Sequence, residues 1–254
     1  MTNANVLEKG TRQTIPVLEI FGPTIQGEGM VVGRKTMFVR TAGCDYRCSW
    51  CDSPFTWDGS AKSDIIQMSA TSILDRLKEL GQNRFDHVTI SGGNPALLAH
   101  VGTLVDLLHE KGIQVALETQ GSKWQPWMTR INDLTISPKP PSSGMVTNFE
   151  KLDSILDQIK LVSNPHQQVS LKVVVFDEID FEFAKKVHSR YPEIPFFLQV
   201  GNDDIKTEDN AYLTSHLLQK YEWLINKTIE CEELNDVRVL PQVHALIWGN
   251  KRGV

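Results

Sequence analysis

The sequence has no apolar run long enough to cross a membrane, for which about 18 consecutive residues are needed. Residues 1–14, MTNANVLEKGTRQT, also lack the apolar core of a secretory signal peptide. Positive charge is not in excess, because 26 Lys and Arg stand against 31 Asp and Glu, for a net charge of −5. These absences argue against a membrane protein, a secreted protein and a broad nucleic-acid-binding surface, and we expect the protein in the cytoplasm.

The composition also argues against a disordered chain. Charged residues make up 22% and hydrophobic residues 41% of the sequence, as in globular proteins. At about 150 residues per domain, this length fits one large α/β domain or two small ones. The sequence shows no internal repeat and no low-complexity linker, so we predict a single domain over residues 1–254.

Cysteine is scarce, and most of it is clustered. Three of the four cysteines, Cys44, Cys48 and Cys51, follow a C-x3-C-x2-C spacing, and Cys231 stands alone. Clustered thiols in a reducing compartment indicate metal or redox chemistry. Three thiolates on a four-iron cluster leave one iron without a protein ligand, and that iron can bind a substrate or a cofactor. The alternatives are a zinc site, whose fourth ligand would be Cys231 or a histidine, and three unligated surface thiols.

Strand-like and helix-like segments alternate along the chain. Predicted strands cover residues 17–21, 36–40, 87–91, 113–117, 134–137, 169–176, 196–200 and 237–240. Predicted helices cover residues 71–80, 95–108, 149–161, 181–191 and 211–225. This order predicts an α/β fold with a parallel sheet, built as an open or closed βα barrel. Several strands lack alternation of polar and apolar residues, as expected when both sheet faces are covered.

One crossover helix is expected to be missing. The connection from Glu118 to Leu134 is short and contains Pro126. In a parallel barrel the chemistry lies at the carboxyl ends of the strands. Unusual residues follow five predicted strands, namely the cysteine loop, Gly92-Gly93-Asn94-Pro95, Glu118-Thr119-Gln120-Gly121-Ser122, Pro138-Lys139-Pro140-Pro141 and Gly201-Asn202-Asp203-Asp204. We expect these segments to form one rim.

Several residues permit both a structural and a functional interpretation. Arg40 ends an apolar strand, so its charge requires either a structural acid or a substrate carboxylate. Lys172 lies inside the run VSLKVVVF and also requires a partner. The segment Gly27-Glu28-Gly29 is either a hairpin turn or a functional loop with an embedded carboxylate, and Gly92-Gly93 is either a tight turn or a ligand contact. His244 is either structural or catalytic, and Cys231 is interpreted as a passive thiol.

The residues from Gly43 to Asp52, with Trp50 before the last cysteine, resemble the cluster loop of radical S-adenosylmethionine (SAM) enzymes. Further segments resemble the 7-carboxy-7-deazaguanine synthases of queuosine-precursor biosynthesis, in their Bacillus-like form. These segments are Glu19-Ile20-Phe21, Ile25-Gln26-Gly27-Glu28-Gly29, Phe38-Val39-Arg40, Cys51-Asp52-Ser53, Ser91-Gly92-Gly93-Asn94-Pro95, Glu118-Thr119-Gln120-Gly121, Ser137-Pro138-Lys139 and Leu171-Lys172-Val173-Val174.

The resemblance implies a partial (β/α) barrel of the radical SAM type with a reduced number of helices. It implies a [4Fe–4S] cluster, SAM as a regenerated cofactor and Mg²⁺. The implied reaction is a ring contraction of 6-carboxy-5,6,7,8-tetrahydropterin to 7-carboxy-7-deazaguanine, with loss of ammonia. It also implies an electron donor such as flavodoxin and a homodimer. The cofactors supply the difficult chemistry, while the protein orients and shields the reactants.

The resemblance also assigns roles to individual residues. The cluster ligands would be Cys44, Cys48 and Cys51, and Ser53 would help to hold Mg²⁺. The substrate contacts would be Ile25, Gln26, Gly27, Arg40 and Ser91, where Arg40 suits a carboxylate. The SAM contacts would be Trp50, Cys51, Asp52, Gly93, Ser137, Pro138, Lys139, Gln199, Val200, Gly201 and Asn202. The candidates for proton handling are Glu28, Glu118 and His244.

The sequence departs from the family at two positions. The family's glycine motif usually carries Glu where this chain has Asn94, and many relatives have Thr where Ser53 stands. Two rival functions also remain at this stage. The first is another radical SAM enzyme, such as an activase that installs a glycyl radical on a partner protein, and the second is a metal-binding module without enzymatic activity.

Overall fold

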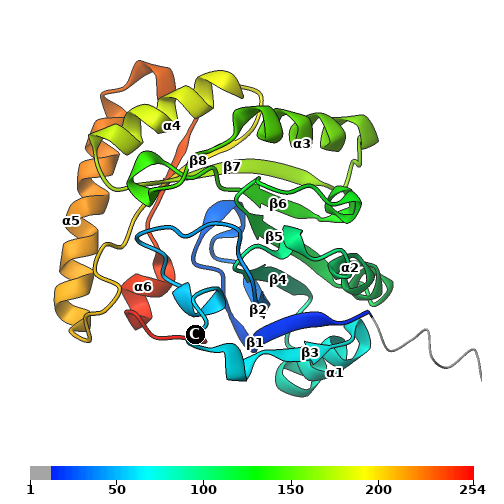
Figure 1. Ribbon diagram of the computed structural model, residues 1–254. Coiled ribbons are helices and arrows are strands. Elements are labelled where there is room, and N and C mark those ends of the chain that lie inside the picture. Colours follow the sequence, from blue (N-terminus) through cyan, green and yellow to red (C-terminus); the bar gives the residue numbers. More distant parts are fainter. Residues whose placement is uncertain (1–12) are drawn as a thin grey trace, which may run out of the picture.

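The strands form one nine-stranded sheet in the computed structural model, which describes residues 13–254 (Figure 1). The order across the sheet is β3-β1-β2-β4-β5-β6-β7-β8-β9. Strands β2 and β4 to β9 run parallel, whereas β1 pairs antiparallel with both β2 and β3. The strands are β1 Ile15–Ile25, β2 Lys35–Thr41, β3 Ile66–Met68, β4 His87–Gly92, β5 Gln114–Thr119, β6 Asp133–Ile136, β7 Gln168–Val175, β8 Phe196–Val200 and β9 Arg238–Leu240.

Helices cover the outer side of the curved sheet (Figure 1). These helices are α1 Ala70–Gly81, α2 Val101–Glu110, α3 Phe149–Val162, α4 Glu178–Arg190 and α5 Asn210–Ile229, and the short α6 Val243–Trp248 packs against α5. The edge strands β3 and β9 lie at opposite ends of the strand order in the described chain, so the barrel is open. The 3-10 turn Pro126–Arg130 stands between β5 and β6 in place of a crossover helix, which confirms the predicted absence.

The two faces of the parallel strands differ in polarity. Met37, Val39, Val88 and Ile90 belong to the main apolar core together with residues of the helices. Arg40 follows Val39 and Ser91 follows Ile90. Their side chains lie on the opposite face, because successive side chains of a strand alternate. The same alternation places Glu118, Lys172 and Gln199 on the inner face of the barrel. The polar residues within these mostly apolar strands therefore line the inside of the barrel.

The structure corrects three sequence-based expectations. The first strand has 11 residues instead of five and is antiparallel to its neighbour, because it forms a hairpin with β2. The predicted helix from Pro95 to Leu108 is divided into a 3-10 turn, Pro95–Leu97, and α2, since Leu98 has extended backbone angles. The short elements β3 and α6 have three and six residues and were not predicted. The expectation that residues 1–14 form no signal peptide concerns a segment of which residues 1–12 lie outside the described range.

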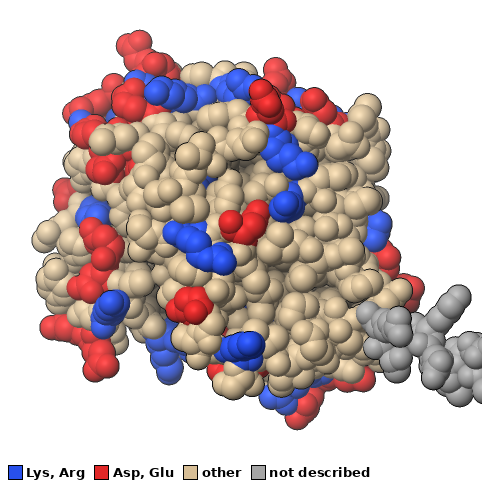
Figure 2. Space-filling model, viewed as in Figure 1, with Lys and Arg blue, Asp and Glu red and all other residues tan. Residues whose placement is uncertain are grey.

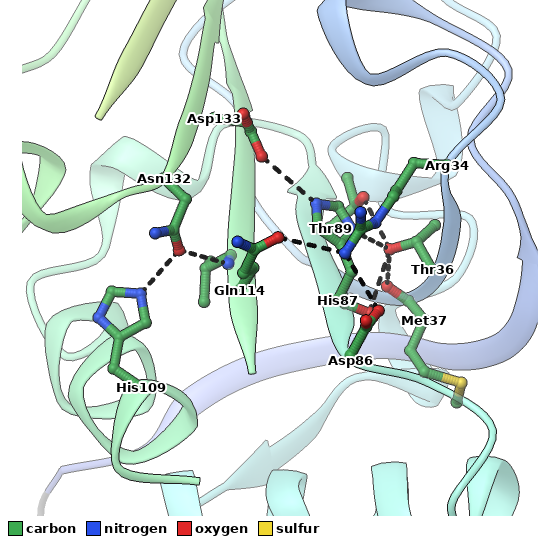
Figure 3. Close-up of polar contacts among 11 residues, drawn as sticks. Arg34, Thr36, Met37, Asp86, His87, Thr89, His109, Gln114, Asn132 and Asp133 are labelled. Carbon is green, nitrogen blue, oxygen red and sulfur yellow. Dashed lines mark hydrogen bonds and ion pairs between the residues drawn. The ribbon is translucent and has the colours of Figure 1, made fainter. Parts of the chain in front are cut away.

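The end of the sheet away from the cysteine loop carries a polar network of its own (Figure 3). Arg34 donates to Asp86 and Gln114 at 3.1 Å each, and His87 Nδ1 lies 2.8 Å from Thr36 Oγ1. A cavity of about 390 Å³ opens there, lined in part by Arg34 and Gln114. These hydrogen bonds connect the amino-terminal ends of the neighbouring strands β2, β4 and β5.

The surface shows acidic and basic side chains interspersed on the face seen in Figure 2. Within residues 13–254, no helix combines the length and apolar character that a membrane crossing requires.

We expect Leu104→Ala to lower the free energy of unfolding by about 2–5 kcal/mol, because Leu104 is fully buried between α2 and the sheet. Urea unfolding followed by circular dichroism measures this loss. Leu161→Ala is the matched control, since Leu161 in the last turn of α3 is 77% exposed. Equal losses in the two variants would contradict the packing described here.

Candidate functional site

The cysteine loop begins where β2 ends. Cys44, Cys48 and Cys51 are half-buried free thiols. The amide of Tyr46 lies 3.4 Å from Cys44 Sγ, and the indole of Trp57 donates to Cys51 Sγ at 3.4 Å. Hydrogen bonds of this kind to cluster sulfurs tune the potential of iron–sulfur centres. Hydrogen-bond donors are therefore in place at two of the three thiols, Cys44 and Cys51.

The electrostatics of the loop favour a positive group at the sulfurs. Burial raises the pKa of the Cys48 thiol to about 11, although Lys139 acts in the opposite direction. Burial likewise raises the pKa of Cys51, in spite of the hydrogen bond from Trp57. Since metals bind the thiolate form, a bound metal would displace these protons.

The spacing of the sulfurs argues against a single zinc ion. Within residues 13–254, the one group of His, Cys, Asp and Glu ligand atoms all within 4.8 Å of one another is Glu28, Asp52 and His244. The three cysteine sulfurs are therefore not all within 4.8 Å of one another. Sulfurs bound to one zinc ion, with Zn–S bonds of about 2.3 Å, lie closer together than that. Cys231 lies beyond α5, where its thiol is 3.5 Å from Glu233, and it does not join the loop.

Gly92 and Gly93 pack directly against the cysteine loop. A Cβ atom on Gly92, whose φ is +132°, would lie 2.2 Å from the carbonyl oxygen of Thr41. A Cβ on Gly93 would lie 2.2 Å from the carbonyl oxygen of Gly43. Both glycines are thus required by the close approach of two backbones, which joins the two predicted functional segments.

Asn94 links the cysteine loop to the segment after β5. Its side chain is fully buried and donates to Asp45 at 2.9 Å and to Ser122 at 3.0 Å. Its oxygen accepts from the hydroxyl of Thr119 at 2.8 Å and from the amide of Ala96. All polar atoms of this side chain are used inside the protein. The residue that replaces the family's usual Glu is therefore a structural link in this chain.

Lys172 forms a buried ion-pair network inside the barrel. Its ammonium group lies 2.7 Å from Glu28 and 2.8 Å from Glu118, and its side chain is only 3% exposed. Burial alone would raise the pKa of Glu28, but the charges of Lys172 and His244 and the hydrogen bonds to the carboxylate lower it overall. Burial alone would lower the pKa of Lys172, yet the two carboxylates raise it overall. The ionic form of this network is therefore the stable one.

The hairpin loop between β1 and β2 carries Glu28 into the barrel. The amide of Gln242 donates to Glu28 at 2.9 Å, and His244 Nδ1 lies 3.8 Å from the same carboxylate. Gly27 has no space for a side chain, because a Cβ would lie 2.8 Å from the His244 amide nitrogen. The segment is thus a hairpin loop whose embedded carboxylate pairs with Lys172, and its functional role stays a prediction.

Arg40 and Ser91 are neighbours on β2 and β4. The Arg40 guanidinium lies 3.4 Å from Glu19 and donates to Ser53 Oγ at 3.3 Å. Arg252, near the end of the chain, also pairs with Glu19 and stacks over the ring of Phe55. A structural acid therefore accompanies Arg40.

The consecutive residues expected to read the pterin differ in their surroundings. Gln26 is buried and its side chain accepts a bond from the Glu28 amide, whereas Ile25, the last residue of β1, is exposed opposite Lys35. Of the segment, the part from Gln26 to Glu28 lies beside the buried ion-pair network.

A cavity of about 520 Å³ adjoins the cysteine loop and is lined in part by Trp50, Phe176 and Asn202. The rings of Trp50 and Phe176 are 4.9 Å apart, and Gly201 has no room for a side chain beside the Phe176 ring. Gln199 is fully buried, and its amide has no hydrogen-bond partner within residues 13–254. A cavity with an aromatic wall and an unsatisfied amide nearby suits a polar heterocyclic ligand.

Lys139 also lies near Trp50 and is hydrogen-bonded to Ser137. The Lys139 ammonium donates to Ser137 Oγ at 3.1 Å and lies 5.9 Å from the Trp50 ring. Burial lowers the pKa of Lys139, although Cys48 acts in the opposite direction. Pro138 lies between Ser137 and Lys139, and Val200 ends β8 directly before Gly201.

Sequence reasoning missed four residues that the structure places at this site: Asp45, Ser142, Asp180 and Gln242. Asp45 accepts a bond from Gln120 at 2.7 Å. Its place directly after Cys44 in the sequence is the feature from which its role at the loop could have been predicted. Ser142, Asp180 and Gln242 follow no local pattern, and only the three-dimensional fold brings them to the site.

Comparison with known proteins gives the family. The radical SAM superfamily model matches residues 38–135. The 7-carboxy-7-deazaguanine synthases of Bacillus cereus and Bacillus subtilis are 63% and 65% identical to the chain over 240 residues, which are 94% of this chain and 99% and 98% of theirs. The chain belongs to the 7-carboxy-7-deazaguanine synthase family. This confirms the predicted family, its Bacillus-like form and the enzyme class, and radical SAM membership implies a [4Fe–4S] cluster and SAM.

Solved structures support the fold alone. The crystal structure of QueE from Escherichia coli superposes with a TM-score of 0.66 at 23% identity, over 96% of this chain and all of that chain. SuiB of Streptococcus suis, in the structure with its precursor peptide, gives 0.56 at 13% identity, over 82% of this chain and 49% of that one. The radical SAM fold is therefore confirmed.

We expect Lys172→Met to lower the free energy of unfolding at pH 7 by about 3–5 kcal/mol, because two buried carboxylates lose their cation. The difference in unfolding free energy between wild type and variant should narrow as the pH falls below the ordinary Glu value of 4.5. The lowered pKa of Glu28 contributes stability above that value, and the wild-type chain loses this contribution as the pH approaches the lowered pKa. Urea unfolding between pH 7 and about pH 2 measures both effects.

The matched control is Lys185→Met, whose partners Glu182 and Glu233 are exposed and whose loss should change stability little. A Lys172→Met deficit that stayed constant with pH would contradict the ionic network.

Proposed function

We propose that the chain converts 6-carboxy-5,6,7,8-tetrahydropterin to 7-carboxy-7-deazaguanine with release of ammonia. The product and ammonia together contain all the atoms of the substrate, so the overall reaction needs no net oxidant. The observation that carries the proposal is the identity of 63–65% with two 7-carboxy-7-deazaguanine synthases over 94% of the chain. The polar lining of the barrel beside the cysteine loop supports it.

Cys44, Cys48 and Cys51 would hold the cluster, as their half-burial and their hydrogen-bond donors support. When bound, the cluster and SAM together supply a one-electron cleavage that generates a hydrogen-abstracting radical. The remaining SAM contacts would come from Trp50, Asp52, Gly93, Ser137, Pro138, Lys139, Gln199, Val200, Gly201 and Asn202. Trp50 and Asn202 line the cavity of about 520 Å³, which supports their assignment. The buried amide of Gln199, which has no hydrogen-bond partner in the described residues, supports a ligand contact for this residue.

Arg40 and Ser91 would bind the substrate carboxylate. Their adjacency on β2 and β4 supports this role, as does the position of Arg40 beside Ser53. In this proposal Glu19 orients the guanidinium through its Nε atom, at 3.4 Å, and the terminal nitrogens face Ser53 and the substrate. Ile25, Gln26 and Gly27 belong to the loop that would read the pterin ring.

Mg²⁺ would be held near Ser53, beside the carboxylate of Asp52. The proximity of Asp52, Glu28 and His244, whose ligand atoms lie within 4.8 Å of one another, supports a divalent cation or its bound waters here. Glu28, Glu118 and His244 remain the candidates for moving protons. Glu118 is of special interest, because one of its carboxylate oxygens is buried without a hydrogen-bond partner in the described residues.

We further infer a single domain over residues 1–254, since strands from Ile15 to Leu240 share one sheet. An electron donor such as flavodoxin, a homodimer and a cytoplasmic location remain proposals of the sequence analysis.

We expect Cys48→Ala to abolish formation of 7-carboxy-7-deazaguanine and leave the barrel folded, because Cys48 lies in a loop outside the apolar core. The measurement is an anaerobic assay with reductant, SAM, Mg²⁺ and the pterin, read by mass spectrometry, with iron counting and thermal unfolding. Cys231→Ala is the matched control and should retain iron and product.

A wild-type chain that binds zinc without iron would overturn the enzyme assignment. A chain that cleaves SAM without converting the pterin would instead favour another radical SAM reaction, such as activation of a partner protein.

We expect Ser53→Ala to raise the Mg²⁺ concentration needed for half-maximal activity by roughly tenfold, since one oxygen donor is lost. Titration of activity with Mg²⁺ measures the shift. Ser63→Ala is the control, because Ser63 is exposed and bonds only to Asp64. An unchanged titration would remove Ser53 from the magnesium site.

A further inference from the structure

Asp180 is a fully buried carboxylate in the first turn of α4. Within residues 13–254 it has no Lys, Arg or His at salt-bridge distance. Burial of a carboxylate without a cation costs free energy unless hydrogen bonds replace those of water. The bonds made by Asp180 therefore indicate what the residue is for.

Three donors surround the Asp180 carboxylate. Ser142 donates its amide to Oδ1 at 3.0 Å and its hydroxyl to Oδ2 at 2.6 Å. The amide of Phe176 donates to Oδ2 at 3.1 Å. Asp180 thus joins the segment after β6 to the segment after β7, and charge-assisted bonds of this kind are the stronger ones.

Ser142 extends this link to the cysteine loop. Its hydroxyl, which donates to Asp180, accepts a bond from the indole nitrogen of Trp50 at 2.9 Å. Its carbonyl oxygen accepts from the hydroxyl of Ser49 at 2.7 Å, and the carbonyl of Ser143 accepts from the Ser49 amide at 3.0 Å. A hydroxyl that donates to a carboxylate becomes a better acceptor, so the bonds reinforce one another.

The segments joined by Asp180 are walls of one cavity. Ser49, Trp50, Ser142 and Phe176 all line the cavity of about 520 Å³ beside the cysteine loop. Asp180 lies behind these walls and does not line the cavity. A change at Asp180 would therefore act on a bound molecule only through Ser142, Phe176 and Trp50.

We propose that Asp180 is a positioning residue that fixes Trp50 and the second half of the cysteine loop, and thereby sets the affinity for SAM. The inference rests on the proposed function for the identity of the ligand. The bonds that carry it are those from Ser142 and Phe176 to Asp180 and from Trp50 to Ser142.

The test is Asp180→Asn in the full chain, reconstituted anaerobically with its cluster. An asparagine has one acceptor oxygen where the carboxylate has two, and it carries no charge. With that oxygen at the Oδ2 position, the NH2 group would face the Ser142 backbone amide, which is itself a donor, and the bonds from the Ser142 hydroxyl and the Phe176 amide would lose their charge assistance. We expect SAM to bind about tenfold more weakly by isothermal titration. We also expect faster hydrogen exchange over residues 44–57, with iron content retained.

Two further variants separate positioning from general destabilisation. Asp106 lies on α2 and forms an exposed ion pair with Arg130. Asp106→Asn should change neither the SAM affinity nor the hydrogen exchange of residues 44–57. Ser142→Ala keeps the carboxylate but removes the hydroxyl between Asp180 and Trp50, and it should weaken SAM binding as well. The double variant should be little weaker than Asp180→Asn alone, because both changes interrupt the same chain of bonds.

Unchanged SAM affinity or unchanged exchange in Asp180→Asn would overturn the proposal, as would additive losses in the double variant. If Asp180→Asn does not fold, Ser142→Ala decides by the same two readouts. If the shifts occur but the wild-type chain forms no deazaguanine, the proposed function fails while the positioning role stands.

Discussion

The bonds of Lys172 to Glu28 and Glu118 connect parts of the chain that are far apart in sequence. Glu28 comes from the β1–β2 loop, Glu118 from β5 and Lys172 from β7. Since an unpaired charge is costly inside a protein, these groups hold one another at the centre of the barrel. The loop is thereby fixed inside the barrel, and the chain after β9 is bound to it through Gln242.

The cysteine loop is held independently from two sides. Asp45 is bound by Asn94 and Gln120, and Ser49 and Trp50 are bound to the segment around Ser142. Preorganised loops of this kind hold ligands in place without reordering at each turnover. The hydrogen bonds of the Asn94 side chain are all made within the protein, so this side chain serves to hold the loop.

Strands β2 and β4 to β9 and the helices α1, α3, α4 and α5 were predictable, because their apolar positions form clear runs or recur with a clear period. The motif Cys44 to Cys51 and the glycines at 92 and 93 also indicated the site. Antiparallel β1 was not predictable, since its direction depends on pairing with β2. The role of Asp180 was not predictable either, because its partner Ser142 is 38 residues away along the chain. Arg40 and Lys172 left two interpretations open, and the structure provides a carboxylate partner for each.

The contacts between the two ends of the chain have a consequence for biosynthesis. Glu19 and Glu28 emerge from the ribosome well before Gln242, His244 and Arg252, which lie against them. Domains generally begin to fold from the amino terminus during translation. The newborn hairpin therefore meets Arg40 and Lys172 first, and these cations offset the charges of the two carboxylates before the later contacts form. The surroundings of Glu28 are thus completed in two steps, and the contacts with Gln242 and His244 belong to the second.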